Sequence, residues 1–494
     1  MLSDSIDNGA GALAAAMASG DIDGTNLFVL SGQAGTGAGE GLAMCEIVHD
    51  LAPQASLYFA TGIPTNTRMA ANILALADAG CRVIIDDVTY ADESPFQDGP
   101  IARAVDTVSA NGVLYFATAG NSGNLDSGFS ATWEGDYVDS GYGDNTGEWH
   151  AFAPGVDENP IGNGGYDFSA DLFWSDPLGA SANDYDLYML DGSGDVIYYS
   201  NNYQGGAQDP YEHINESQSL SAGYYLVVVL YNGAGRFLHL DFGRGRLVYA
   251  TAGCLRGHNT CAAANAFSVA ATPAAGSETT GYPTGPYPNP FDASNVVEPF
   301  TADGPRQIFF NPDGSAITPG NFSSTGGLVL MKPEFSAADG VTTTLPLNGG
   351  LNPFFGTSAA APHAGAIAAL VLSCNPTLTP AQVRTVLTNS CIDIMAAGWD
   401  RDSGWGILMA QAALQNTPPL LSPSFVSGSL AGLPGGGFQA TLAGMAGASY
   451  QILVSSDLQT WSPFSTLSMT NTNSVFIDAT AGLDRRFYRA QLMQ

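Results

Sequence analysis

Positive charge is scarce in this 494-residue chain, which has 14 Lys and Arg against 46 Asp and Glu. The formal net charge at pH 7 is -32, and Lys332 is the single lysine. A surface of this sign repels phosphate backbones and anionic membranes, so the composition argues against nucleic-acid binding. It suits an exported protein or an acidic or salty environment, although solubility alone also accounts for it.

The sequence also has no apolar run long enough to suggest a bilayer span, and it has only six cysteines. Three disulfides fit an exported protein, with Cys254 close to Cys261 and with Cys374 and Cys391 flanking a helical segment; free buried thiols are the alternative. The chain starts without a signal peptide, which argues only weakly against export. We expect a secreted monomer with no membrane span.

Hydrophobic residues make up 45% of the chain and charged residues 12%, which is enough apolar material for a sizeable core. The length exceeds that of most single domains, so two or three domains are expected. We expect an α/β region in two parts, an inserted jelly-roll-like antiparallel β-sandwich and a C-terminal β-rich module, with the respective boundaries 1–134 and 248–417, 135–247, and 424–494.

The patterning supports this division. Apolar strands alternate with helical segments between residues 26 and 121, which predicts a parallel sheet with helices on both faces. Short alternating strands separated by Gly, Asn and Asp turns follow, as expected of antiparallel sheets. A Pro-rich segment, QNTPPLLSP, precedes the last β-rich region and is typical of a domain linker.

The stretch GTSAAAPHAG, residues 356–365, places Ser358 on a tight turn that enters an Ala/Gly-rich helix. A helix N-terminus offers free N–H groups and the positive end of a dipole, which stabilise an oxyanion. The small residues after the serine let a substrate backbone approach closely. The plain alternative is a serine that only caps the helix.

This stretch resembles the nucleophile motif of the subtilases, and the resemblance extends over about 1–134 and 248–417. It implies a subtilisin-like fold and a serine endopeptidase that works through an acyl-enzyme, with Ser358 as the nucleophile. Asp4, in LSDSID, matches the aspartate of the family, and Asn121, in AGNSG, matches its oxyanion-hole asparagine. A protein or peptide substrate follows from this resemblance.

The sequence departs from the subtilases at the general base. Where the family has a histidine in a Gly-His-Gly-Thr turn, this chain has Glu40, and His49 lies nine residues further along, on the opposite helix face. The sedolisins, which share the subtilase fold, resemble this chain in using glutamate as the base. However, they place an aspartate one helical turn later, where Met44 stands here. We therefore expect Glu40 to be the base and Asp4 to be its partner.

Two carboxyl groups held close in a poorly hydrated cleft share a proton, and the upper pKa of the pair rises. This predicts hydrolysis that favours acidic pH. Two alternatives remain open. The protein is a catalytically inactive binding or adhesion protein that keeps the fold, or its activity recruits a histidine such as His49 or His258.

Other acidic segments have weaker signals. Asp86 and Asp87 follow a strand at the carboxyl edge of the sheet, where they either touch substrate or cap the loop. Acidic walls there favour basic or neutral peptides. The segment 393–406 resembles the calcium loop of the sedolisins; plain structure is the alternative. By that resemblance the calcium ligands are the carboxylates of Asp393 and Asp400 and the carbonyls of Ile394, Ala396 and Gly398.

Overall fold

The structure is a computed structural model, and it describes residues 1–162, 169–215, 222–255, 263–347, 349–420, 422–434, 436–480 and 485–493. Two compact units result: Met1–Ala369 with Leu387–Ala413, and Leu370–Val386 with Leu414–Gln494.

The first unit is built on a nine-stranded sheet in which all neighbouring strands are parallel except the last pair. In spatial order its strands are β2 (Leu27–Val29), β3 (Leu57–Thr61), β1 (Leu2–Ser3), β4 (Val83–Asp86), β5 (Leu114–Thr118), β16 (Phe267–Pro273), β19 (Phe335–Asp339), β21 (Ile407–Leu408) and β20 (Cys391–Ile392). The helices among the described residues are α1 (Ala12–Ser19), α2 (Glu40–Leu51), α3 (Asn66–Asp78), α4 (Pro100–Ala110), α5 (Thr357–Cys374), α6 (Pro380–Thr388) and α7 (Ala410–Asn416).

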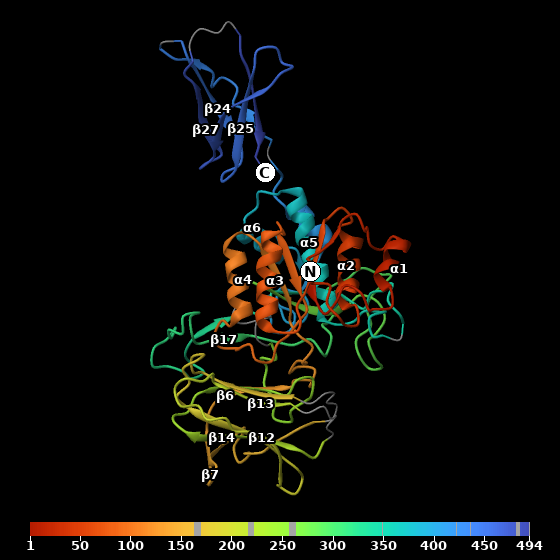
Figure 1. The fold of residues 1–494 in the computed structure, drawn as a ribbon, viewed down its shortest axis with the longest axis vertical. Helices are drawn as coiled ribbons and strands as arrows, with labels where there is room; N and C mark the ends of the chain where they lie inside the picture. Colours follow the sequence, from red (N-terminus) through yellow and green to blue (C-terminus); the bar gives the residue numbers. More distant parts are fainter. Residues whose placement is uncertain are drawn as a thin grey trace. The chain divides into compact units, whose positions relative to one another are not determined.

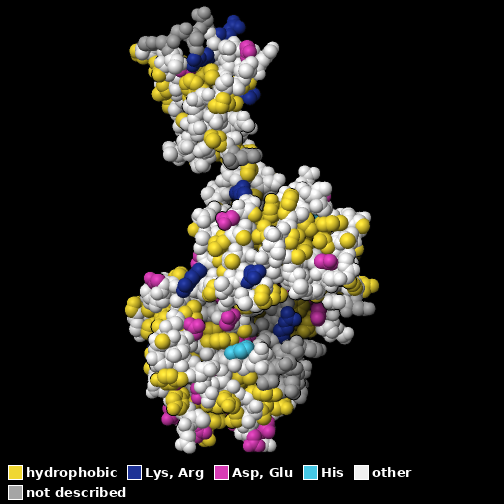
Figure 2. Space-filling view, viewed as in Figure 1, with side chains coloured by type: hydrophobic (Ala, Val, Ile, Leu, Met, Phe, Trp, Pro, Cys, Tyr) yellow, Lys and Arg dark blue, Asp and Glu magenta, His cyan; other side chains and the backbone are white. Residues whose placement is uncertain are grey.

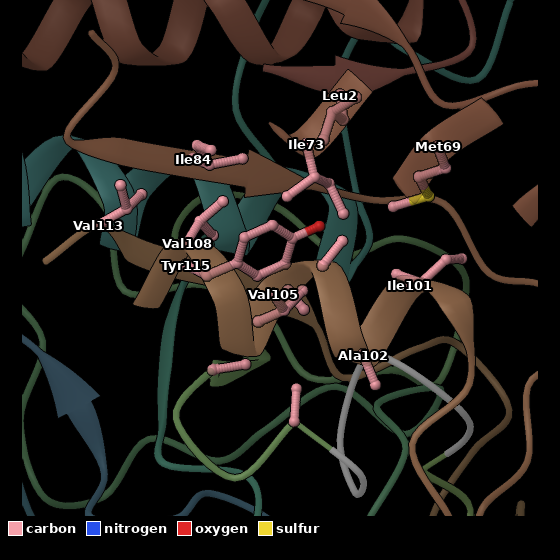
Figure 3. Packing of buried hydrophobic residues seen from close by; sticks show 14 of the residues in the cluster. Leu2, Met69, Ile73, Ile84, Ile101, Ala102, Val105, Val108, Val113 and Tyr115 are labelled. Carbon is pink, nitrogen blue, oxygen red and sulfur yellow. The ribbon is translucent and has the colours of Figure 1, made fainter. Parts of the chain in front are cut away.

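Consecutive residues of β4 show how helices cover both faces of this sheet. Ile84 packs with apolar side chains of α3 and α4 in one buried cluster (Figure 3). Ile85 points to the other face, where its side chain fills the space beside Gly365 of α5. Side chains alternate across a strand, so one apolar run serves two helix layers. The predicted α/β fold with a parallel sheet and helices on both faces is confirmed.

The chain between β5 and β16 forms two further antiparallel sheets, drawn as two layers in Figure 1. Leu172 and Leu240 of one sheet share a buried cluster with Leu187 and Val228 of the other. The first sheet contains β13 (Tyr211–Asn215), β10 (Ser169–Trp174), β15 (Phe237–Asp241) and β6 (Thr132–Asp136). The second contains β12 (Val196–Ser200), β11 (Asp184–Leu190), β14 (Tyr225–Asn232), β8 (Gly147–His150), β7 (Asp139–Asp144) and β9 (Asn159–Pro160). Because β6 starts at Thr132, the insert begins slightly before residue 135.

A buried ionic network ties this insert to the α/β core. Arg306 lies in β17 (Arg306–Ile308), which pairs with β18 (Leu328–Leu330), and its side chain is fully buried. Its guanidinium lies 2.5 Å from Glu134 of β6, and His239 of β15 lies 2.6 Å from the same carboxylate. Burial, followed by the charge of Arg306, lowers the pKa of His239. The network therefore pairs Arg306 with Glu134 beside a neutral imidazole.

The last β-rich segment has a core of its own. Tyr450, Ile452 and Phe476 are among its buried residues, and other aromatic residues of the same segment pack around them. Its strands are β22 (Ser424–Phe425), β23 (Ala431–Gly432), β24 (Phe438–Ala443), β25 (Ser449–Ser455), β26 (Ser462–Ser468), β27 (Asn473–Asp478) and β28 (Phe487–Leu492). They form one sheet around β24 and another around β25.

The structure bears on the expected disulfides and on the expected absence of a membrane span. No disulfide joins the described cysteines, which include Cys254, Cys374 and Cys391, while Cys261 lies outside the described residues. Within the described part of the chain, one helix, α5, is long and apolar enough to cross a membrane, but 72% of that window is buried in the protein. A buried core helix meets the same criterion, so this is a weak indication of a span.

Charged side chains of both signs are scattered over the face shown in Figure 2, with apolar and uncharged surface between them. No continuous positive patch is seen on that face. This distribution agrees with the composition, which argued against binding to phosphate backbones.

Candidate active site

Ser358 is the second residue of α5, and it is 8% exposed. Gly356, two residues earlier, has φ 125°, a conformation that favours glycine. The Gly356 N–H donates to Asp339 Oδ2 at 2.9 Å, which fixes the turn. The serine therefore stands at the amino end of a long helix, where backbone N–H groups lack acceptors within the helix.

Asn121 is oriented by the residue just before the serine. Its Oδ1 atom accepts hydrogen bonds from the Thr357 N–H at 3.1 Å and from the Thr357 hydroxyl at 2.8 Å. The Nδ2 group is left as a donor, and it lies 3.4 Å from where a Cβ on Gly356 would be. The amide group therefore lies beside the serine turn.

The amino end of α2 is held by Asp4, from the end of β1. The N-cap of α2 is Gly39, which offers no side-chain cap. Asp4 supplies the missing acceptor: its Oδ1 receives the N–H groups of Glu40 at 2.9 Å and Gly41 at 3.3 Å, and its Oδ2 receives that of Ala38 at 2.6 Å. Asp4 therefore fixes the backbone at Glu40.

The carboxylate of Glu40 meets the nucleophile. It lines the same cavity as Ser358 and Asp87, and both of these side chains act on its pKa as hydrogen-bonding neighbours. Burial raises the pKa of Glu40, and the charge of Asp4 adds to this, while the Ser358 hydrogen bond and the positive charge of Arg244 partly oppose it. A carboxylate with a raised pKa is a better base for a serine hydroxyl than a free one.

Ser358, Asn121 and Glu40 line one cavity of about 180 Å³. Thr118 to Ser122 form one wall at the end of β5, and Asp87 and Thr89 form another after β4. Arg244 reaches the cavity from the segment that follows β15 of the insert. The full lining is Glu40, Asp87, Thr89, Thr118, Ala119, Gly120, Asn121, Ser122, Gly243, Arg244, Cys254, Thr357 and Ser358.

None of the described histidines lines this cavity. His49 lies in the last turn of α2, away from the cavity lining. His363 lies within α5, with Nδ1 2.8 Å from the Ala359 carbonyl oxygen. His258 lies outside the described residues.

The small residues after Ser358 have a packing role. Ala359, Ala360 and Ala361 are fully buried. A Cβ on Gly365 would lie 2.3 Å from the Ile85 side chain, so the helix could not sit this close to the sheet with a larger residue. The packing of α5 on β4 therefore also explains why these residues are small, apart from the expectation that they let a substrate approach.

The predicted calcium loop has its acceptors engaged by its own backbone and side chains. Asp400 Oδ1 accepts the N–H groups of Asp402 and Ser403, and its Oδ2 accepts the Ser403 hydroxyl at 2.7 Å. Asp393 accepts the Gly398 N–H at 2.9 Å. These residues are a poor fit to a calcium ligand set, and calcium binding there stays a prediction.

Comparison with known protein families identifies the family of this chain. A model of the Subtilase family matches residues 31–406 of the 494. The chain belongs to the subtilase family. The match spans strands β3, β4, β5, β16, β19 and β20 of the sheet, the insert and the Ser358 motif.

Curated relatives match this subtilase over short stretches. Fervidolysin of Fervidobacterium pennivorans is 41% identical over 73 residues, 15% of this chain and 10% of the relative. Subtilisin of Bacillus pumilus is 36% identical over 117 residues, 24% of this chain and 40% of the relative. The matches thus span less than half of either protein.

Solved structures of proteases are similar over a larger share of the chain. The CspB protease of Clostridium perfringens covers 73% of this chain and 74% of its own, with 13% identity and a TM-score of 0.43.

The structure brings most of the predicted site together. Ser358, Glu40 and Asn121 line one cavity, and Asp4 bonds the backbone of Glu40. The sequence had indicated Asp87 as a candidate, because it follows a buried strand at the carboxyl edge of the sheet. It had not indicated that Asp87 lies close to Glu40.

Two further residues of the site were missed. Arg244 had no local signal, because the insert that brings it back is more than a hundred residues long. Thr357 could have been found from its place beside the serine, since a hydroxyl there can reach a neighbouring strand end.

Proposed function

We propose that this subtilase is a serine endopeptidase that hydrolyses peptide bonds through an acyl-enzyme. The observation that carries the proposal is that the side chains of Ser358, Glu40 and Asn121 come together in one cavity, with Ser358 at the amino end of α5. A nucleophile, a base and an oxyanion donor are the parts that acyl transfer requires.

In the first step, Ser358 Oγ bonds to the substrate carbonyl carbon and its proton passes to Glu40. The oxyanion accepts hydrogen bonds from Asn121 Nδ2 and from the Ser358 backbone N–H. Glu40 then gives its proton to the departing amine as the C–N bond breaks. Water, deprotonated by Glu40, releases the acyl group and restores the serine.

The raised pKa of Glu40 fits work at acidic to neutral pH, where the usual glutamate would be a feeble base. Asp4 serves this base by holding its backbone and by adding negative charge. We also propose that the protein acts outside the cell. Its relative Epr of Bacillus subtilis is described as a minor extracellular protease.

The test is single-turnover labelling of Ser358 by a fluorophosphonate between pH 3 and pH 9, for the wild type and for Glu40→Gln. The amide keeps the size of the glutamate but cannot take a proton, so labelling should fall by about 10²–10⁴-fold. Glu46→Gln, on the same helix but bonded to Thr344, is the matched control and should label normally. A folded wild type that never labels would instead indicate an inactive binding protein.

A further inference from the structure

Asp87 lines the same cavity as Ser358 and Glu40, and one of its two carboxyl oxygens has no hydrogen-bond partner among the described residues. Ser3 donates its hydroxyl to Asp87 Oδ2 at 3.0 Å, which anchors the carboxyl at the end of β4. The Oδ1 atom is buried and has no donor among the described residues. A buried carboxylate oxygen without a hydrogen bond is costly, unless the oxygen carries a proton and acts as a donor.

Glu40 is the acceptor that such a proton would reach. The Asp87 side chain is close enough to act on the pKa of Glu40 as a hydrogen-bonding neighbour, and a hydrogen bond between two carboxyl groups requires a proton on one of them. Both line the same cavity, Glu40 from the amino end of α2 and Asp87 from the segment after β4. The second acidic neighbour, Asp4, is differently placed: both of its oxygens accept backbone N–H groups.

Building on the proposed function, we propose that Asp87 is the proton-sharing partner of Glu40, and that it positions the base by donating its carboxyl proton to the Glu40 carboxylate. The pair then carries one negative charge at rest. Glu40 takes the Ser358 proton through its other oxygen, the Asp87 proton stays where it is, and the negative charge moves to the oxyanion at Asn121. When the C–N bond breaks, Glu40 passes this proton to the departing amine, and the pair again carries one negative charge.

The surroundings keep the proton on the pair. Glu40 faces Asp87 from α2, Asp86 precedes it in β4, Asp4 lies at the end of β1, and the cation Arg244 comes from the insert. Burial, followed by the charge of Glu40, raises the pKa of Asp87 well above its usual range. Loss of the shared proton at high pH would leave two adjacent negative charges, which is unfavourable in a buried site.

The arrangement differs from a glutamate with an aspartate one turn later on the same helix. At that position α2 has Met44, which is fully buried. Here the second carboxyl comes from the neighbouring sheet strand, at the point where β1 and β4 end side by side. The sheet rather than the helix therefore supplies the partner.

The experiment compares kcat/KM for a peptide substrate over pH 3 to 10 in the wild type, Asp87→Asn, Asp87→Ala and Asp87→Glu. Asparagine keeps a neutral N–H donor that cannot ionise. Asp87→Asn should therefore stay within about tenfold of the wild type at its optimum, and its alkaline decline should disappear or move up by at least one pH unit. Asp87→Ala should lose about 100-fold or more, and Asp87→Glu should recover part of this.

The control is Asp92→Asn, an exposed residue of the same loop that bonds Asn66 and should leave the profile unchanged. Infrared difference spectra at neutral pH give a second readout, because the C=O band of a protonated carboxyl should be present in the wild type and lost in Asp87→Asn. The inference is overturned if Asp87→Asn and Asp87→Ala lose activity equally with unchanged pH limbs, or if the band is absent. Loss of labelling in Glu40→Gln would then still uphold the proposed function.

Discussion

Several buried carboxyl groups in this subtilase have raised pKa values, and they differ in what surrounds them. Glu40 and Asp87 face each other in a cavity with a serine and an arginine. Burial, followed by the charge of Asp106, raises the pKa of Asp98 to about 8. Glu298 is fully buried, and neither of its carboxylate oxygens has a donor among the described residues. A raised pKa therefore marks burial in this protein, and the neighbouring groups decide whether it serves chemistry.

Glu298 gives a pH-dependent prediction of stability. Burial, followed by the charges of Asp339 and Glu278, raises its pKa from 4.5 to about 9. The folded state holds this proton more tightly than the unfolded state, so its contribution is full below pH 4.5 and is lost as the pH rises towards 9. In Glu298→Gln this loss is absent. The free energy of unfolding of the variant should therefore rise relative to that of the wild type between pH 5 and pH 9, by up to about 1 kcal/mol per pH unit.

Urea unfolding at pH 5, 7 and 9 would measure this gain. Glu278→Gln is the control, because Glu278 is exposed and its removal should change the slope much less. Parallel curves for Glu298→Gln and the wild type would show that Glu298 is ionised in the folded protein.

At the scale of secondary-structure elements, the site depends on how helix α2 begins. Gly37 and Gly39 leave the turn without a side-chain cap, and a Cβ on Gly37 would lie 2.2 Å from Asp4 Oδ2. The glycines let a carboxylate from the neighbouring strand approach and take the place of the cap. Helix and strand are thus joined at the residue that carries the base.

Asp4→Asn tests this junction. The amide replaces one acceptor oxygen by a donor, so at least one of the N–H groups of Ala38, Glu40 and Gly41 loses its partner. The free energy of unfolding should fall by about 1–3 kcal/mol, and fluorophosphonate labelling should slow because Glu40 is displaced. Asp7→Asn is the matched control: Asp7 accepts one N–H, from Leu13 at 3.2 Å, and its change should cost less. Equal losses in stability with normal labelling would refute the role given to Asp4.

At the scale of the whole first unit, the insert takes part in the site instead of only adding bulk. Its last strand, β15, leads into Gly243 and Arg244, which line the same cavity as Ser358 and Glu40. The same strand carries His239, which with Glu134 and Arg306 anchors the insert to the core. Arg306 also donates to the Gly253 carbonyl, next to Cys254 of the cavity lining. The anchor and the cavity are therefore structurally connected.

Arg306→Met is expected to weaken the attachment of the insert to the core and to disturb the cavity. Removing the arginine leaves Glu134 without its guanidinium partner in a nearly buried place, which should lower the unfolding free energy by about 3–5 kcal/mol. The double variant Arg306→Met, Glu134→Gln should recover part of that loss, because the unpaired charge is gone. Chemical denaturation, with fluorophosphonate labelling of each folded variant, would test this. If the double variant is no more stable than the single one, the ion pair is not the anchor.

The sequence by itself determined the parallel sheet, the helices on its two faces and the place of Ser358. Alternation of apolar strands and helices is a local pattern, and the Ser358 motif lies within ten residues, so both can be read along the chain. The absence of a histidine at Glu40 was equally visible there, and so was the acidic balance that argued against nucleic acid.

Only the tertiary structure decided which carboxyl faces which. Asp4, Glu40 and Asp87 come from two strand ends and a helix start, and their relative positions depend on the order of β1, β4 and β5 in the sheet. The resemblance to the subtilases had favoured Asp4 as the partner of Glu40, whereas in the structure Asp4 bonds the backbone of Glu40 and Asp87 lines the same cavity as Glu40. Proton sharing acts over a few ångströms between residues that are distant along the chain, so it is fixed by packing and cannot be read from local pattern.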